Sequence, residues 1–184
     1  MSDSFLYTSI LDPLAKPLLD ELLFEYQSRY GTFFSAAGAK EEMNKYPPEA
    51  FSPPYGNFLL LLRNGQAIGG GAFMRYDDDT AEFKRVWTHS AYRRQGLAKK
   101  VLIELERQAV RQGYSRIYLT TGFRQPEAVG LYLSNGYSAL FDRQADPETI
   151  RSLPFEKWLS VATSAAIESA SAVSNPGHQF FVSR

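Results

Sequence analysis

The sequence predicts a mixed α+β fold in which a hairpin-rich sheet contains one parallel crossover. The first observation is a hairpin, because the apolar run 58–62 ends at Asn64-Gly65 and a strand pattern resumes at 67–76. The second is a change of element type: a strand pattern at 81–88 precedes an amphipathic helix pattern at 97–112 and another strand pattern at 116–121. That order implies a right-handed crossover between two parallel strands.

The N-terminal segment predicts one strand and one helix before this unit. Residues 4–11 fit a strand, and Asp12-Pro13 is a favourable helix start, with an acidic N-cap and proline at the first position. Apolar residues then recur at helical spacing until Gly31. Residues 32–57 contain four prolines and no sustained period, so we expect a loop with one short helix around 39–45. Three adjacent glycines at 69–71 predict a bulge or a close backbone approach within a strand.

Composition narrows the classes of function. The 184 residues are 44% hydrophobic and 22% charged, which is ordinary globular usage and sufficient for one core. Twenty basic residues balance 20 acidic ones, so no global field draws the chain to nucleic acid or to a membrane surface. The absence of cysteine and the presence of only two histidines disfavour thiol catalysis and a metal site. Without a signal-peptide pattern or a membrane-spanning run, we expect a cytoplasmic protein.

A basic segment that begins at Arg93 lies between the strand pattern at 81–88 and the helix pattern at 97–112. A helix N-terminus exposes unpaired N–H groups and a partial positive charge, both of which favour phosphate. Gly96 lets the backbone approach a ligand closely. The segment therefore predicts a pyrophosphate cradle, and its spacing excludes both a Walker loop and a dinucleotide fingerprint. Its residues are Arg93, Arg94, Gln95, Gly96, Leu97, Ala98, Lys99 and Lys100.

Several blocks of this chain resemble the GNAT-type N-acetyltransferases. The acetyl-CoA motif Gln/Arg-x-x-Gly-x-Gly/Ala is matched by Arg93, Gly96 and Ala98. Residues 81–88 and 116–121 resemble the fourth and fifth strands of the family, and residues 125–137 resemble its Asn-x-x-Ala-x-x-x-Tyr-x-x-x-Gly-Phe helix and turn. The blocks occur in the family's order and spacing, and the resemblance covers residues 5–159.

The resemblance implies a GNAT fold: a central, mostly antiparallel, twisted sheet of about six to seven strands with one parallel β-α-β crossover, flanked by helices. It implies acetyl-CoA as cosubstrate, no metal, and a homodimer as one permitted assembly. The implied cofactor-binding residues beyond the cradle are the backbone of Val86, Trp87 and Thr88 together with Gln125 and Ala128. Gln125 replaces the usual Asn. Its side chain is longer by one methylene group, so the sequence leaves open whether the amide contacts the pantetheine arm.

Two residues are implied catalysts. Tyr132 occupies the motif position of the general acid, which would protonate the departing thiolate. The alternative for Tyr132 is a core residue on the inner face of its helix. Glu82 is the candidate base, acting directly or through water on an amine that is protonated at neutral pH. The alternative interpretation is that Glu82 is a solvated strand residue or forms an ion pair with Lys84 or Arg85.

The acceptor implied by the resemblance is the primary amine of a small molecule. Arg75, Lys84 and Arg85 offer positive charge to an amino-acid carboxylate, but strand alternation predicts that Lys84 and Arg85 point to opposite faces. The loop aromatics either line the acceptor pocket or fill the core under the loop. They are Phe33, Phe34, Tyr46, Phe51 and Tyr55.

Three other functions remain as alternatives: a catalytically silent acyl-CoA sensor, a protein N-terminal or lysine acetyltransferase, and a nucleic-acid patch formed by the basic segment. The third is disfavoured because no aromatic residues interleave the basic ones. For domain organisation, we expect residues 1–159 to form one acetyltransferase domain. Residues 160–184 form an Ala/Ser-rich appendage with few large side chains, which Phe180 and Phe181 are best suited to dock.

Overall fold

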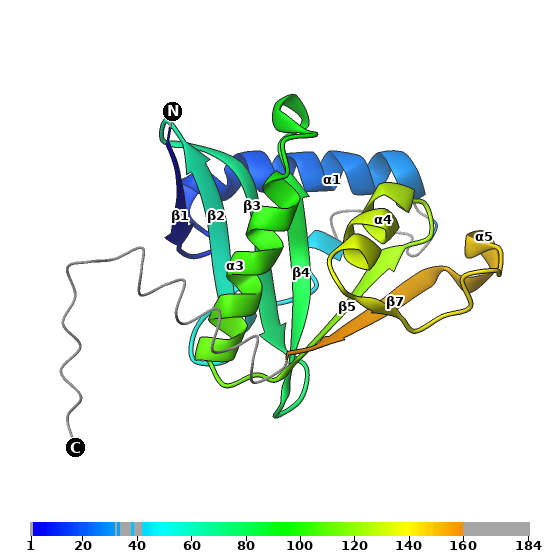
Figure 1. Cartoon of the computed structure of the whole chain (residues 1–184). Coiled ribbons are helices and arrows are strands. Elements are labelled where there is room, and N and C mark those ends of the chain that lie inside the picture. The colour runs from blue at the N-terminus through cyan, green and yellow to red at the C-terminus, as the bar shows by residue number, and fades with distance from the viewer. Residues whose placement is uncertain (1, 32, 34–37, 39–41, 160–184) are drawn as a thin grey trace, which may run out of the picture.

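The computed structural model describes residues 2–31, 33, 38 and 42–159. Its centre is a seven-stranded sheet in the order β1-β2-β3-β4-β5-β7-β6 (Figure 1). The β4–β5 pair is parallel and the other neighbouring pairs are antiparallel. The mixed fold with one parallel crossover is therefore confirmed. The expected appendage, 160–184, lies outside the described residues.

The elements of the N-terminal half follow the expected order. They are β1 (Asp3–Tyr7), η1 (Pro13–Ala15), α1 (Lys16–Tyr30), η2 (Pro48–Phe51), β2 (Asn57–Arg63), β3 (Gln66–Arg75) and β4 (Thr80–Thr88). The first strand is shorter than expected, because Asp12 accepts hydrogen bonds from the Thr8 hydroxyl at 2.6 Å and from Leu14 N at 2.9 Å. Residues 8–12 thus form the approach to the helix. Of the short helix expected around 39–45, residues 42 and 43 are helical and 39–41 lie outside the described residues.

The C-terminal half contains the crossover and the end of the sheet. Its elements are η3 (Ser90–Tyr92), α3 (Leu97–Arg111), β5 (Arg116–Gly122), α4 (Pro126–Ser134), β6 (Ser138–Ala139), α5 (Pro147–Ile150) and β7 (Ser152–Trp158). Helix α3 connects β4 to β5 and buries the apolar stripe that its sequence predicts, including Leu97, Val101, Leu102, Leu105 and Ala109. The crossover places the N-terminus of α3 beside the end of β4.

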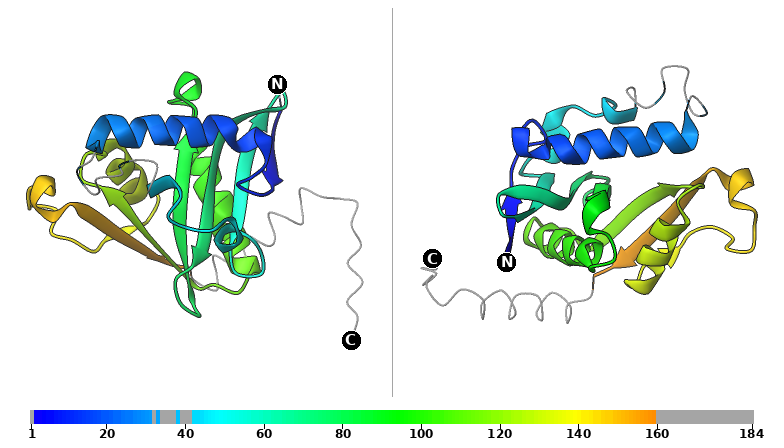
Figure 2. Two further views of the ribbon diagram at one scale, coloured as in Figure 1. Left: turned by 180° about the vertical axis from the view of Figure 1, so that it is seen from behind. Right: turned by 90° about the horizontal axis from the view of Figure 1, so that it is seen from above.

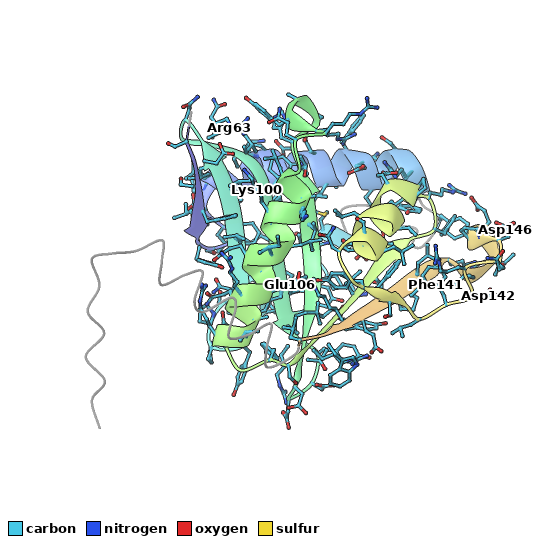
Figure 3. The ribbon with its side chains drawn as sticks, in the orientation of Figure 1. Arg63, Lys100, Glu106, Phe141, Asp142 and Asp146 are labelled. Carbon is cyan, nitrogen blue, oxygen red and sulfur yellow. The ribbon has the colours of Figure 1, made fainter. Side chains whose placement is uncertain are left out.

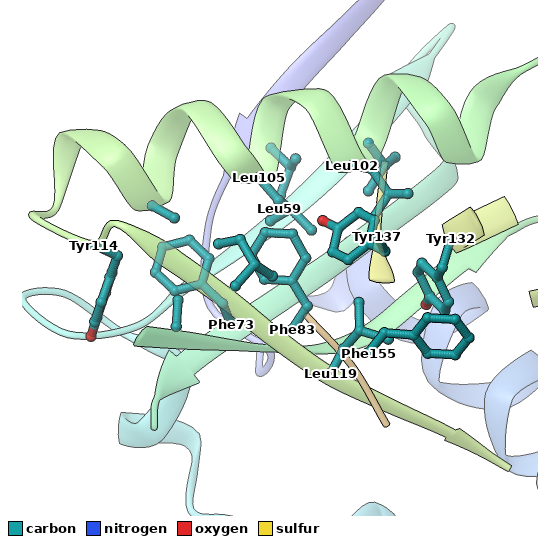
Figure 4. Packing of buried hydrophobic residues seen from close by; sticks show 14 of the residues in the cluster. Leu59, Phe73, Phe83, Leu102, Leu105, Tyr114, Leu119, Tyr132, Tyr137 and Phe155 are labelled. Atoms are coloured by element: carbon teal, nitrogen blue, oxygen red, sulfur yellow. The ribbon is translucent and has the colours of Figure 1, made fainter. Parts of the chain in front are cut away.

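Helices cover both faces of the sheet. Helix α1 lies on one face and α3 and α4 lie on the other, as the view from above shows (Figure 2). The α3 face holds the larger core, in which Phe73, Phe83 and Leu105 pack together (Figure 4). The α1 face holds a smaller core that includes Leu18, Phe51 and Trp87.

The glycines of β3 allow both helices to approach the sheet closely. A Cβ on Gly70 would lie 2.8 Å from Leu18 Cδ1 of α1, and a Cβ on Gly71 would lie 2.8 Å from Leu105 Cδ1 of α3. Both distances are too short for a real Cβ contact. The register between β3 and β4 also shifts at this point. The expected close approach is confirmed, and the extra residue of the bulge lies on β4, opposite Gly71.

A buried ion pair ties α3 to the last strand and to the end of α4. Glu106 of α3 (Figure 3) accepts a hydrogen bond from Lys157 Nζ of β7 at 2.5 Å. The same ammonium group donates to the carbonyl of Asn135, just after α4, at 3.0 Å. Burial raises the pKa of Glu106, and the bonds from Lys157 and Tyr137 partly offset this effect. The contacts hold α4, and with it Tyr132, against the crossover helix.

Candidate active site

The site lies where β4 and β5 separate. Their parallel pairing runs from Thr80↔Arg116 to Glu82↔Tyr118, after which the two strands diverge (Figure 1). A cavity of about 890 Å³ occupies this opening and extends from the N-terminus of α3 to α1. Its walls come from α1, β4, the start of α3, the β5–α4 turn and α4. The open edge of β4 past Glu82 therefore faces a cavity instead of a neighbouring strand.

A β-bulge interrupts β4 at Arg85. Gly70 pairs with Trp87 and Ala72 pairs with Lys84, so two residues of β4 stand opposite the single Gly71. Arg85 has a φ of +60°, the left-handed region that side-chain-bearing residues seldom adopt. Strand alternation is lost here, and both Lys84 and Arg85 line the cavity. The prediction that they point to opposite faces is wrong because it assumed a regular strand.

The predicted cradle forms the other end of the cavity. Helix α3 begins at Leu97 after Gly96, which has a φ of +73°, and no side chain caps its first turn. A Cβ on Gly96 would meet no protein atom within 4 Å, so the space above the helix N-terminus is open. Six of the expected cofactor-binding residues of this segment line the cavity: Arg93, Arg94, Gly96, Leu97, Ala98 and Lys99.

Gln95 and Lys100 of the basic segment have other contacts. The Gln95 side chain accepts a hydrogen bond from Arg63 Nη1 at 3.0 Å, and Gln95 is not part of the cavity lining. Lys100 Nζ lies 3.9 Å from Asp3 Oδ2, and Arg63 binds the same carboxylate at 2.7 Å. Arg63 and Lys100 lie at this end of the sheet (Figure 3). The basic segment is therefore divided between the cavity and β1.

Val86, Trp87 and Thr88 also line the cavity. The Trp87 side chain is buried, and its Nε1 donates to Glu21 Oε1 of α1 at 3.0 Å. Glu21 also accepts from Ser90 N at 2.9 Å and from the Ser90 hydroxyl at 2.5 Å. Glu21 thus joins α1 to the loop between β4 and the cradle. The Trp87 indole is committed to this contact, which agrees with the expectation that only backbone groups of β4 meet a ligand.

Gln125 and Ala128 line the cavity from the β5–α4 turn and from α4. The Gln125 side-chain oxygen accepts from the Tyr30 hydroxyl at 3.1 Å, from Gly122 N at 3.1 Å and from the Thr121 hydroxyl at 3.3 Å. The longer amide at this position therefore reaches back to α1 and closes the turn. Sequence reasoning had no signal for this contact, because Tyr30 and Gln125 are 95 residues apart.

Tyr132 packs in the core, as one of its interpretations predicts, and its role as a general acid stays a prediction. Its ring packs against Tyr137 and Phe155, with centroid distances of 5.6 and 5.5 Å, and the residue is 7% exposed (Figure 4). Tyr132 also lines the cavity, and its hydroxyl makes no hydrogen bond with a residue that the structure describes. Burial raises the pKa of Tyr132, so its phenol keeps its proton well past neutral pH. The hydroxyl can therefore donate to a ligand.

Glu82 lies outside the cavity lining. Its carboxylate pairs with Lys84 Nζ at 3.1 Å, and both side chains are about one-seventh exposed, at 14% and 15%. The ion-pair interpretation of Glu82 is thus confirmed as a contact. The catalytic role of Glu82 stays a prediction. Because Glu82 lies outside the cavity lining, it would have to act on the acceptor through a water molecule.

The structure adds residues of α1 and of the following segment that the motifs did not identify. Tyr26 and Tyr30 line the cavity from α1, Glu42 and Met43 from the segment after it, and Arg151 from the start of β7. Both tyrosines belong to the helical recurrence that ends at Gly31, but that spacing does not distinguish a cavity from a core. Only the packing of α1 over the open edge of β4 makes that distinction.

The loop aromatics prove to be mostly core or surface. Phe51 is buried and Tyr46 stacks on it at 6.2 Å, so the core interpretation holds for both. Phe33 and Tyr55 are 42% and 62% exposed. None of these four lines the cavity, and Phe34 lies outside the described residues. The pocket interpretation is wrong for the four, because the wall it assigned to them is built by α1 and residues 42–45.

Within the described part of the chain, no three His, Asp or Glu side chains gather closely enough to hold a metal ion. The described helices include none with the length and apolar character that crossing a bilayer requires. Arg75, the third cation considered for an acceptor, pairs with Asp78 at the far end of β3 and does not line the cavity.

Comparison with known proteins agrees with this architecture. The family described as "Acetyltransferase (GNAT) family" matches residues 18–137. Over 92 residues the chain is 29% identical to the uncharacterized N-acetyltransferase YjgM of Escherichia coli K12, a match that covers 48% of this chain and 55% of that protein. The chain thus spans about half the length of this curated relative.

Two solved structures share the fold. An acetyltransferase of the GNAT family from Staphylococcus aureus superposes with a TM-score of 0.66 at 18% identity, covering 86% of this chain and 100% of that one. The PaiA N-acetyltransferase from Thermoplasma acidophilum, in complex with coenzyme A, superposes with a TM-score of 0.64 at 19% identity, covering 86% and 99%. The open β4–β5 edge, the α3 N-terminus beside it and the family match over most of the chain lead to one conclusion: this chain belongs to the acetyltransferase (GNAT) family.

Proposed function

We propose that this protein is an N-acetyltransferase that moves an acetyl group from acetyl-CoA to the primary amine of a small molecule by direct attack. The observation that carries the proposal is a single cavity that joins the N-terminus of α3 at Gly96, the open edge of β4 and Tyr132. Family membership supports acetyl-CoA as the cosubstrate, and the PaiA structure contains coenzyme A.

The residues at the cradle fit the phosphates of acetyl-CoA. The uncapped N–H groups at the start of α3 point toward open space, and Arg93, Arg94 and Lys99 surround it. Both features favour a diphosphate. The backbone of residues 86–88 would pair with the pantetheine arm, because none of the described strands pairs with β4 on that edge past Glu82.

The reaction has three requirements: removal of a proton from the amine, stabilisation of the oxyanion and protonation of the departing thiolate. An aliphatic amine has a pKa of about 10 and must lose a proton before it attacks the thioester. The oxyanion that forms needs a preplaced donor, which the free β4 N–H groups supply. The departing thiolate needs a proton, and Tyr132 supplies it because burial keeps its phenol protonated.

Glu82 is the proposed base, acting through water, because its carboxylate lies one strand repeat from the lining residue Lys84. Replacing Glu82 with Gln tests this role, since the amide keeps the size of the side chain and cannot take a proton. We expect lower turnover and loss of the acidic limb of the rate profile, with acetyl-CoA binding unchanged. A Glu82→Gln variant with the parent's pH profile would assign proton removal to water alone.

The activity itself is tested by release of free CoA thiol from acetyl-CoA in the presence of amino acids, polyamines, aminoglycosides and peptides with free N-termini or lysines. Turnover with a small amine supports the proposal. Turnover with peptides only would make the protein a peptide or protein acetyltransferase. If acetyl-CoA raises the melting temperature but no acceptor is acetylated, the protein would be assigned as a CoA-binding sensor.

A further inference from the structure

The acceptor side of the cavity contains a cation that the protein leaves largely unsatisfied. The Arg85 Nη2 donates to the backbone carbonyl of Glu42 at 3.0 Å. Its Nε is buried and has no hydrogen-bond partner. Arg85 forms no ion pair with any residue that the structure describes. A buried Nε without a partner is costly, so such groups usually meet an anion or another acceptor.

Neighbouring charges do not neutralise Arg85. Burial is the main effect on Arg85 and lowers its pKa, whereas the nearby Glu42 carboxylate favours its charged form. Glu42 shares the cavity with two other acidic residues, Glu25 and Glu127, and both of these contact Arg29 instead. The described lining therefore offers Arg85 one nearby carboxylate and no direct ion pair.

The other cations of this wall already have partners. Lys84 Nζ pairs with Glu82 at 3.1 Å and lies 5.0 Å from the Tyr46 ring centroid. Lys45 also lies over Tyr46, at 5.5 Å, and Arg151 lies over Phe33, at 5.1 Å. The described cations that line the cavity outnumber its acidic residues, so the wall is positive as a whole. Arg85 is the cation of this wall with a buried N–H group that has no partner among the described residues.

The bulge explains why Arg85 faces the acceptor. Its φ of +60° turns the side chain to the same side as Lys84, toward α1 and Glu42. Arg85 directly precedes residues 86–88, the stretch of β4 proposed to hold the thioester. An acceptor bound to Arg85 therefore lies next to the reacting carbon.

We propose that the acceptor is an amino-carboxylate, a small molecule with its amine and a carboxylate close together, and that Arg85 binds the carboxylate and so determines specificity. The inference rests on the proposed function. The unpartnered Nε of Arg85 can donate to an anion, and the planar fork of a guanidinium matches the two oxygens of a carboxylate. Polyamines and aminoglycosides carry only positive charge and would meet a positive wall.

The first experiment uses the parent protein and matched pairs of acceptors, amino acids and their carboxamides. Because the carboxamide also lowers the pKa of the neighbouring amine, the rates are compared at equal concentrations of unprotonated amine. We expect kcat/KM to be about tenfold to 100-fold higher for the amino acids, the range of one charge-assisted contact. Equal rates, or faster acetylation of carboxamides or polyamines, would overturn the inference while preserving the proposed activity. A higher rate with aminophosphonates than with amino acids would overturn the assignment to a carboxylate.

The second experiment replaces Arg85 with Gln. We expect the variant to lose the preference for carboxylate, with kcat/KM for the amino acid falling about tenfold to 100-fold and that for the carboxamide changing less than about threefold. Stabilisation by acetyl-CoA should persist. The matched control is Arg75→Gln, since Arg75 contacts Asp78 outside the cavity. If Arg75→Gln reduces the preference equally, general surface charge and not Arg85 is responsible.

A binding measurement separates failure of the inference from failure of the proposed function. If no acceptor is acetylated, the proposed function fails, and the melting temperature of the CoA-bound parent is then measured with amino acids and carboxamides. Extra stabilisation by amino acids that Arg85→Gln abolishes supports the carboxylate site. The absence of extra stabilisation overturns it. If Arg85→Gln does not fold, the comparison of amino acids with their carboxamides on the parent protein still tests whether the acceptor needs a carboxylate.

Discussion

The two ends of the cavity are built in different ways. The cradle end comes from one short segment, 93–99, in which a left-handed glycine is followed at once by the first turn of α3. The acceptor end comes from α1, residues 42–45, the bulge of β4 and the start of β7. The end proposed to hold the phosphates is thus a local feature of the chain, whereas the end proposed to hold the acceptor exists only after distant segments have packed.

Tyr132 stands between the two ends, and its replacement should have the largest effect. Tyr132→Phe keeps the ring that packs against Phe155 and removes the proton. We expect turnover to fall by about a hundredfold to ten-thousandfold, with acetyl-CoA affinity within a few-fold of the parent. The measurement is steady-state turnover together with acetyl-CoA binding. Acetyl analogues with better leaving thiols should recover part of the loss.

A neighbouring tyrosine provides the control. Tyr137 is buried beside Tyr132, donates to Glu106 at 3.4 Å and does not line the cavity. Tyr137→Phe should therefore keep most of the turnover. If both variants behave like the parent, another group or water protonates the thiolate, and Tyr132 belongs to the core alone.

The pH profile tests the same phenol without a mutation. Because burial raises the pKa of Tyr132, its proton is retained as the pH rises through the range where an ordinary tyrosine ionises. We expect no loss of turnover from this group between about pH 7 and pH 9. An alkaline limb in that range that disappears in Tyr132→Phe would contradict the raised pKa.

The cradle can be disrupted by a single methyl group. Gly96→Ala should place a Cβ in the open space above the α3 N-terminus and weaken acetyl-CoA binding by about tenfold or more. At a ligand concentration of 100 times the parent Kd, the stabilisation should drop from about 2.7 to about 1.4 kcal/mol. Melting temperatures with and without acetyl-CoA measure this difference.

Gly65→Ala is the matched control. Gly65 has a φ of +75° against +73° for Gly96, a Cβ there also meets no protein atom within 4 Å, and it does not line the large cavity. Both variants should lose about 1 kcal/mol of stability from the left-handed backbone, but only Gly96→Ala should lose the response to acetyl-CoA. Equal responses would move the phosphates away from Gly96.

Glu21 joins the two ends, so it tests whether they depend on each other. Glu21→Gln weakens the bonds to Trp87 and Ser90, and we expect about 1–3 kcal/mol less unfolding free energy at neutral pH. Burial opposes ionisation of Glu21, but hydrogen bonds from Ser90 and Trp87 outweigh it and lower its pKa. The stabilisation is therefore present above the ordinary value of 4.5 and is lost as the pH falls through the lowered folded-state value.

Denaturant unfolding at several pH values measures this effect. The gap between parent and Glu21→Gln should narrow in acid. The control is Asp20→Asn, because Asp20 lies on the same helix, is 59% exposed and pairs with Lys16. A gap that is constant with pH, or equal for both variants, would show that the Glu21 carboxylate does not hold α1 to the loop after β4.

The smallest effect is expected for truncation after Leu159. Among the residues that the structure describes, those that line the cavity all lie before this point. Acetyl-CoA should therefore stabilise the shortened protein as it does the parent. Loss of that response in a folded truncation would show that residues after 159 contribute to the cofactor site.

The sequence by itself determined the succession of most elements along the chain, the crossover and the start of α3 after Gly96. The physical reason is that hairpin turns, helix starts and left-handed glycines depend on a few consecutive residues. Asn64-Gly65 has the positive φ angles that its hairpin turn predicts. The family motifs can be recognised in the sequence for the same reason, since each one describes a short stretch of backbone.

Only the tertiary structure decided how the acceptor end is made. The bulge at Arg85 depends on pairing with β3 and places Lys84 and Arg85 on one side, which alternation alone had excluded. Gln125 turns to Tyr30 instead of extending along the cavity, and Glu82 pairs with Lys84 outside the lining. These outcomes rest on contacts between residues far apart in the chain or on register between strands. No local pattern encodes them, because their energies arise only when the sheet and α1 have packed together.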